Sequence, residues 1–124
     1  MEIRSLTRAE AEIMKILWHL KKAFIKDVLA QMPEPKPAYT TVATFLKILE
    51  KKQIVSYNTY GNSHEFFPLI SEEEYRRHEV DQLMDNYFDN SVANLVSFFV
   101  KEKGLEDKDL DELASFINNK NKKQ

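Results

Sequence analysis

Cysteine is absent from the 124 residues, and glycine occurs only twice, at Gly61 and Gly104. The absence of cysteine excludes disulfides, thiolate metal ligands and cysteine nucleophiles. Two isolated glycines do not form a glycine-rich phosphate-binding loop of the usual kind. The three histidines, His19, His64 and His78, are far apart and lack the i, i+4 spacing of a helical metal-ligand pair. We therefore predict no metal site, no cofactor and no catalytic residue, and we expect that the protein is not an enzyme.

Long hydrophobic runs are also missing. No apolar stretch approaches the roughly 20 residues that cross a bilayer. The N-terminus carries Glu2 and Arg4 and lacks the apolar segment of a secretory signal. Hydrophobic residues still make up 43% of the chain, and no polar low-complexity tract interrupts it. We therefore expect a folded, soluble, cytoplasmic protein.

The net charge of −2 is divided unevenly along the chain. Residues 1–70 contain ten Lys and Arg against seven acidic residues, a net charge of +3, which leaves −5 for residues 71–124. Such asymmetry suggests a basic binding module joined to an acidic module with another task.

Residues 39–52 predict a helix with two different faces. Read at helical period, its apolar stripe consists of Val42, Phe45, Leu46 and Leu49. The opposite side offers short hydroxyls and long cations, which suit the base edges and phosphates of DNA: Thr40, Thr41, Thr44, Lys47 and Lys51. The alternative is an ordinary amphipathic helix with a lysine-rich surface. Taken alone, the pattern favours that alternative, so the choice between the two interpretations depends on the flanking segments.

Two further helices are predicted before residue 39. Thr7 and Glu10 form a capping box at the start of the first, and a second helix is expected over residues 24–32. The segment 33–37 has a proline at every other position, which ends the second helix and keeps the connector extended. Two helices with a stiff connector, the second carrying exposed hydroxyls and cations, are typical of a helix-turn-helix DNA reader.

After Lys52 the period of the pattern changes from 3.6 to 2. Residues 54–59 and 63–67 predict two strands, and Gly61 between them supplies the positive φ of a tight turn. Three helices followed by a hairpin is the winged-helix order. We therefore expect a mainly α fold with a small β-hairpin wing, and a winged-helix DNA-binding domain over residues 1–70. His64, beside the hairpin tip, is either a phosphate contact or, more commonly at such a position, an exposed strand residue.

A helical dimerisation region is predicted over residues 71–124. Ser71 and Glu74 form a second capping box, three apolar stripes at helical period follow, and Gly104 is expected to cap the middle helix. Three helices in about fifty residues rarely hold a core together alone. Two aromatic side chains also lie off the main stripes of their helices, which suggests burial against a second copy. The residues predicted to dimerise are Tyr87, Phe88, Leu95, Phe98, Phe99, Leu113, Phe116 and Ile117.

Three segments of the chain, 6–18, 39–46 and 49–52, together with the hairpin, resemble the penicillinase-repressor family of the BlaI/MecI/CopY type. The most specific of them reads Tyr39-Thr40-Thr41-Val42-x-Thr44-x-Leu46, and the resemblance runs from about Leu6 to about Ile117. It implies a homodimeric winged-helix transcriptional repressor that binds inverted-repeat, double-stranded operator DNA. The DNA-binding residues predicted from the helix and the resemblance together are Tyr39, Thr40, Thr41, Thr44, Lys47, Lys51, Gly61 and Asn62.

The resemblance also implies a route of release from DNA. In this family release is commonly by proteolysis after a membrane-bound β-lactam sensor-protease, encoded nearby, responds. The cleaved bond would fall near Phe98-Phe99, where the β-lactamase repressors have Asn-Phe. The copper-responsive branch uses a cysteine-containing metal site, which this sequence lacks.

Phe98 thus departs from the family pattern, and two other positions do so as well. Gln53 stands where a glycine usually ends the recognition helix, and Asn62 stands where a basic residue usually follows the hairpin glycine. Asn62 and the mild charge of +3 support an alternative function, a winged-helix protein-interaction module without DNA binding.

Overall fold

The computed structural model describes Ile3 and residues 5–122, so Glu2 and Arg4 lie outside the described residues. The chain divides into two compact units, Met1–Glu79 and Val80–Gln124. The functional ranges expected from the sequence, 1–70 and 71–124, stay a prediction. In the part of the chain that the structure describes, no helix has both the length and the apolar character to cross a membrane.

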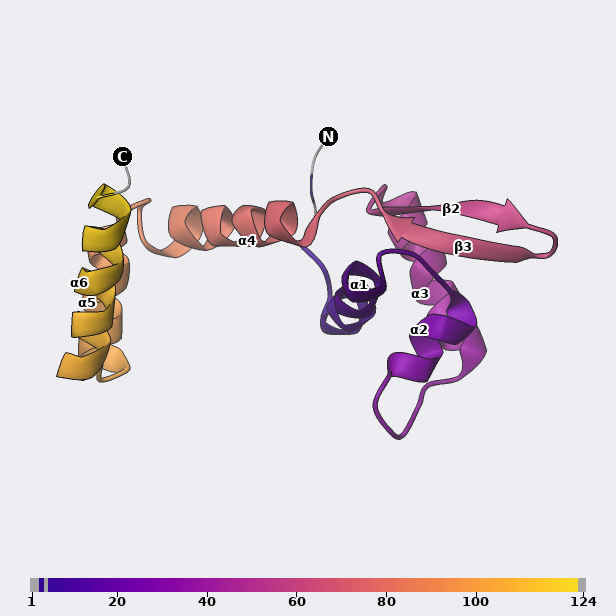
Figure 1. Cartoon of the computed structure of the whole chain (residues 1–124), viewed down its shortest axis with the longest axis horizontal. Helices are drawn as coiled ribbons and strands as arrows, with labels where there is room; N and C mark the ends of the chain where they lie inside the picture. The colour runs from indigo at the N-terminus through magenta and orange to yellow at the C-terminus, as the bar shows by residue number, and fades with distance from the viewer. Residues whose placement is uncertain (1–2, 4, 123–124) are drawn as a thin grey trace. The chain divides into compact units, whose positions relative to one another are not determined.

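The first unit contains three complete helices on one side of a small antiparallel sheet, together with the start of a fourth helix (Figure 1). The helices are α1 (Arg8–Leu20), α2 (Ile25–Gln31) and α3 (Tyr39–Lys51). The strands are β1 (Ala23–Phe24), β2 (Val55–Tyr60) and β3 (Ser63–Pro68), in the order β1-β3-β2. The expected mainly helical fold with a hairpin wing is confirmed.

The hydrophobic core of this unit lies between the helices and the inner face of the sheet. Its fully buried side chains come from all three helices and from β2: Ile13, Met14, Leu17, Val28, Val42, Leu46, Leu49 and Val55. Three of the four stripe residues of α3 are among them, and Phe45 is half-buried. The core therefore fixes which face of α3 points outward.

The start of α1 has the predicted capping box. The Thr7 hydroxyl accepts the Glu10 N–H at 3.2 Å, and the Glu10 carboxylate accepts the Thr7 N–H at 2.9 Å. These two bonds satisfy donors that the first turn of a helix leaves open.

The first strand, β1, corrects the expected extent of the second helix. Residue 24 was expected to be helical, but Phe24 is paired with Glu65 of β3, and α2 begins at Ile25. The Asp27 carboxylate accepts the Phe24 N–H at 3.0 Å, so Phe24 precedes the helix as its cap residue. A two-residue strand is too short to show an alternating pattern, which is why the sequence does not reveal it.

The end of α3 is a Schellman motif. The Ile54 N–H donates to the Leu49 carbonyl and the Gln53 N–H to the Glu50 carbonyl, both at 3.0 Å. Gln53 has φ 62°, the left-handed conformation that glycine usually supplies at this position. Ile54 and Leu49 are both buried in the core, and such an apolar contact commonly accompanies the motif.

The hairpin that forms the wing turns at Gly61, which has φ 61° as predicted. No atom lies within 4 Å of the place where a Cβ would stand, so the requirement for glycine here is conformational and not steric. Strands β2 and β3 pair from Val55↔Pro68 to Tyr60↔Ser63, and the two residues of the tip, Gly61 and Asn62, are exposed.

Helix α4 (Glu72–Tyr87) begins in the first unit and ends in the second. Its predicted capping box is present, because the Ser71 hydroxyl accepts the Glu74 N–H at 3.0 Å and the Glu74 carboxylate accepts the Ser71 N–H at 3.1 Å. Tyr75 fastens its first turn: the phenol oxygen accepts the Leu6 N–H at 2.8 Å. Burial and the neighbouring Glu79 carboxylate raise the pKa of Tyr75 to about 12.

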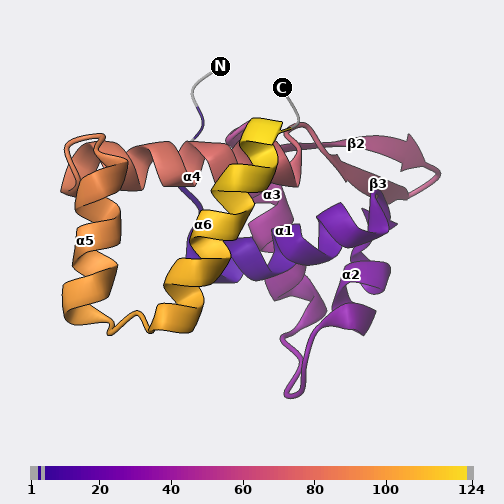
Figure 2. The same ribbon diagram turned by 60° about the vertical axis from the view of Figure 1, so that its left-hand side comes forward.

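The second unit contains the end of α4 together with α5 (Val92–Glu102) and α6 (Asp107–Lys122). Figure 2 shows α5 and α6 as two separate helices joined by a short loop. Gly104 follows the end of α5 with φ 63°, as expected of a helix-capping glycine. Among the described residues of this unit, Met84 is the one buried hydrophobic side chain, and it is 9% exposed.

Candidate nucleic-acid interface

Helix α3 presents the predicted polar face to solvent. The predicted residues of α3, including its first residue Tyr39, are exposed, as are the two residues of the hairpin tip: Tyr39, Thr40, Thr41, Thr44, Lys47, Lys51, Gly61 and Asn62. Burial of Val42, Leu46 and Leu49 on the opposite side holds this face outward. The structure thus brings the helical candidates together on one surface, and their contact with DNA stays a prediction.

The three threonines of this face differ in their hydrogen bonds. The Thr44 hydroxyl donates to the Thr40 carbonyl one turn earlier, at 2.9 Å. Its proton is therefore used within the helix, and only its oxygen lone pairs are available to a ligand. The Thr40 and Thr41 hydroxyls make no side-chain hydrogen bond to any other described residue, so both can donate and accept.

Two lysines near α3 make contacts that stabilise the fold and are not part of this surface. The Lys52 ammonium lies 2.9 Å from one oxygen of the Glu10 carboxylate and 3.1 Å from the other. The Lys36 ammonium donates to three carbonyls near the end of α2, those of Leu29, Ala30 and Met32, at 2.8–3.1 Å. Lys36 thereby caps α2 and holds the proline connector that leads to α3.

The carboxylate that pairs with Lys52 is almost completely enclosed, with Glu10 only 2% exposed. Burial raises the pKa of the Glu10 carboxyl, but the hydrogen bonds from the Thr7 N–H and the Lys52 ammonium outweigh burial, and the pKa lies below its usual value. Glu10 is therefore ionised at neutral pH, and its buried negative charge is compensated by the Lys52 ammonium. By contrast, Lys47 and Lys51 form no ion pair with any residue in the described range, and both remain available for phosphate.

A groove of about 530 Å³ separates α3 from the hairpin. Lys47, Glu50 and Lys51 line its helical side, and Tyr57 and His64 line its hairpin side. The His64 ring lies 4.2 Å from the Tyr57 ring, and its Nδ1 lies 3.2 Å from the Thr59 hydroxyl. His64 is thus held against the strands next to the two cations of α3. A contact between His64 and phosphate stays a prediction.

The predicted dimerisation residues are largely exposed in the single chain. Tyr87 is 76% and Phe116 70% exposed, and Phe98, Phe99, Leu113 and Ile117 also face solvent. Phe88 and Leu95 are half-buried, and the Phe88 and Phe98 rings contact edge to face with centroids 5.6 Å apart. Apolar area of this extent on three helices is typical of a surface that a partner covers.

The bond between Phe98 and Phe99, the predicted cleavage position, lies within α5. A protease needs an extended substrate, so cleavage there requires local unwinding of the helix. In the single chain Phe98 is 42% and Phe99 39% exposed, and unwinding there breaks the contact between the Phe98 and Phe88 rings.

Sequence reasoning did not single out Lys26 or Tyr60 as functional residues. Both line a second concavity at the surface, beside Tyr39 and Asn62. They lie on α2 and β2, away from the helix that carries the other candidates. The sequence signal is chemical only: a lysine in the first turn of α2 and a tyrosine directly before the hairpin glycine.

Comparison with known proteins gives a consistent picture. The family model described as "Penicillinase repressor" matches residues 6–119. The chain is 23% identical to the penicillinase repressor of Staphylococcus aureus over 119 residues, covering 95% of this chain and 94% of the relative. It is 22% identical to the penicillinase repressor of Bacillus licheniformis, covering 99% and 98% of the two chains. The methicillin resistance regulatory protein MecI of Staphylococcus aureus strain N315 is also 22% identical, covering 93% and 94%.

One solved structure extends this likeness to three dimensions. The solution structure of the DNA-binding domain of the repressor BlaI superimposes with a TM-score of 0.52 at 25% identity. The match covers 60% of this chain and 92% of that domain.

Proposed function

This chain belongs to the penicillinase repressor family, a family of DNA-binding transcription repressors, and on that premise we propose that it is a homodimeric repressor of inverted-repeat operator DNA. The observation that carries the proposal is the outward face of α3, on which three threonines and two lysines without ion pairs in the described chain lie together. The similarity of this chain to the DNA-binding domain of BlaI also supports DNA binding by this face. The place of action would be the cytoplasm, where operator DNA is found.

Lysines and threonines on this face have different tasks. Lys47 and Lys51 neutralise phosphates or contact guanine, since a long cation reaches both. Thr40 and Thr41, with free hydroxyls, read base edges, and Thr44 acts mainly as an acceptor. The hairpin tip at Gly61 and Asn62 follows the backbone.

Titration of salt separates these roles. Replacing Lys51→Ala removes one phosphate contact and lowers the slope of log affinity against log salt by about one. Thr40→Val keeps the shape of the side chain but removes the hydroxyl, so it leaves that slope unchanged and weakens the preference for an operator selected from a random pool. Negligible binding of random duplex by the wild-type protein at low salt would favour the protein-interaction module instead.

The second unit provides the dimer interface. Its exposed aromatic and aliphatic side chains form a surface that a second copy buries. Two α3 helices are then held at a fixed separation, and each reads one half of the operator. Short threonine side chains suffice for recognition because the two half-sites add their contributions.

Release from DNA is proposed to follow cleavage of α5 near Phe98-Phe99 by a membrane sensor-protease that responds to a β-lactam-type signal. The family membership and the partial exposure of the two residues on α5 support this route. Immunoblots of cells before and after the inducing signal test it. Persistence of full-length protein while the target gene is expressed would exclude proteolysis as the cause of release.

A further inference from the structure

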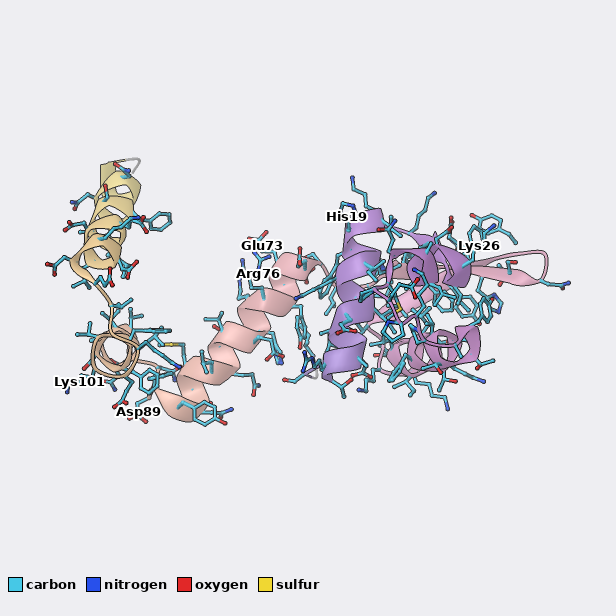
Figure 3. The ribbon with its side chains drawn as sticks, turned by 90° about the horizontal axis from the view of Figure 1, so that it is seen from below. His19, Lys26, Glu73, Arg76, Asp89 and Lys101 are labelled. Atoms are coloured by element: carbon cyan, nitrogen blue, oxygen red, sulfur yellow. The ribbon has the colours of Figure 1, made fainter. Side chains whose placement is uncertain are left out.

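The second concavity lies between the start of α2, the start of α3 and the tip of the hairpin. Its volume is about 380 Å³. The polar side chains that line it are Lys26, Tyr39, Tyr60, Asn62, Ser63 and His64. Figure 3 shows Lys26 at the end of the first unit from which the hairpin projects.

The chemistry of this lining is that of an anion site. Every polar group there can donate a hydrogen bond: one ammonium, two phenols, an amide, a hydroxyl and an imidazole. No carboxylate lines it, whereas Glu50 lines the groove between α3 and the hairpin, and Glu12 lines a pocket under the proline connector. An anion entering this concavity therefore meets donors and no facing negative charge.

The carboxylates closest along the chain or across the sheet are not part of the lining. Asp27, next to Lys26 in sequence, accepts the Phe24 N–H at 3.0 Å and is thereby held to the backbone. Glu65, the cross-strand partner of Phe24, is outside the lining. Lys26 is exposed and makes no ion pair with any residue that the structure describes. Its charge therefore remains available to a ligand.

The two tyrosines are positioned for an external partner. Tyr39 is 54% and Tyr60 55% exposed. The Phe24 ring contacts the Tyr60 ring edge to face, with centroids 6.1 Å apart, which orients Tyr60 beside the start of α2. Tyr39 directly precedes Thr40, and Asn62 is at the hairpin tip. A DNA strand that reaches from the α3 threonines to the hairpin therefore passes over this concavity.

We propose that this concavity binds a backbone phosphate of duplex DNA, with Lys26 as its cation and the Tyr39 and Tyr60 hydroxyls as donors. The inference rests on the proposed function and adds to it a contact outside α3. One phosphate is held here from three elements, so this contact fixes the angle between the α3 helix and the wing on the duplex. Because phosphate carries no base identity, the site contributes equally to operator and random DNA.

Substitution of the cation tests the site. We expect Lys26→Ala to lower the salt slope by about one for operator and random duplex alike. Lys26→Arg should restore the slope, since it restores the charge. Lys15→Ala is the matched control, because Lys15 is an exposed lysine of α1 that lines neither concavity. It should leave the slope unchanged, and thermal melting should show that all three variants fold.

The hydroxyl donors are tested separately. The double variant Tyr39→Phe with Tyr60→Phe should weaken binding by roughly three- to tenfold for each hydroxyl, with no change in the salt slope. A wild-type protein that binds no duplex would refute the proposed function itself. Wild-type binding with an unchanged slope in Lys26→Ala would overturn this inference alone, even if inorganic phosphate bound at the concavity.

Discussion

Lys52, at the end of α3, donates to Glu10, in the first turn of α1, with 2.9 Å between its Nζ and the nearer carboxylate oxygen. Forty-two positions separate the two residues in sequence. The pair ties the candidate recognition helix to the helix that supports it, and Glu10 also closes the capping box of α1. One buried carboxylate thus joins a helix start to a helix end.

Replacement of the two neighbouring lysines at the end of α3 should affect the stability of the fold very differently. Lys52→Ala leaves the Glu10 carboxylate buried without its partner, and we expect a loss of about 2–4 kcal/mol in the free energy of unfolding. Lys51→Ala, at an exposed position, should change that free energy by less than about 0.5 kcal/mol. Urea unfolding of both variants measures the difference. Equal stabilities would show that the Lys52–Glu10 pair contributes nothing.

Stability should fall in acid partly through Glu10. Its pKa is lowered in the folded protein, so its contribution is present above the unfolded value near 4.5 and is lost as the pH falls through the lower folded value. We expect Glu10→Gln to be less stable than wild type at pH 7. The gap in urea midpoint should narrow as the pH falls below the unfolded value near 4.5. A gap that stays constant over this range would contradict the assignment.

The end of α3 offers a stabilising substitution. Gln53 has φ 62°, which costs a residue with a Cβ more than it costs glycine. Gln53→Gly should therefore raise the free energy of unfolding by about 0.5–1 kcal/mol, after allowance for the greater flexibility of the unfolded chain. Gln53→Ala is the control, since it removes the side chain but retains the Cβ. If both variants gain stability equally, the gain does not come from the backbone conformation.

The exposed surface of the second unit should control the oligomeric state. Phe116 is 70% exposed, so Phe116→Glu should leave the monomer folded while it disfavours burial against a second copy. Sedimentation should then show a shift from dimer to monomer. Asn118→Glu adds the same charge to the same exposed helix on its other side, and it should leave the dimer intact. Dissociation by both variants would point to general charge repulsion.

Much of the first unit follows from local signals in the sequence. The caps at Thr7 and Ser71 and the turn at Gly61 were predicted correctly because each depends on residues within one turn of the chain. The two-residue strand β1 was missed because its partner, β3, lies some forty residues away and its own pattern is too short.

In the candidate site, too, local features could be predicted from the sequence, and contacts between distant segments could not. The outward face of α3 was predicted from its helical period, since burial of one side determines the other. The helical period places Lys51, and not Lys52, on the outward face, but only the fold shows that Lys52 is paired with Glu10. Likewise, the concavity around Lys26 is formed by three elements, so no single segment of sequence contains it.

The most direct test of the central claim is the affinity for an operator selected from random DNA, measured at two half-site spacings. A dimer with two α3 helices at fixed separation should bind tightly when the half-sites are one helical turn apart, or a small multiple of it. Lengthening the spacing by half a turn, about 5 base pairs, should abolish tight binding and leave only the salt-dependent binding of random duplex. Equal affinity for both spacings would contradict the account of a dimeric operator-binding repressor.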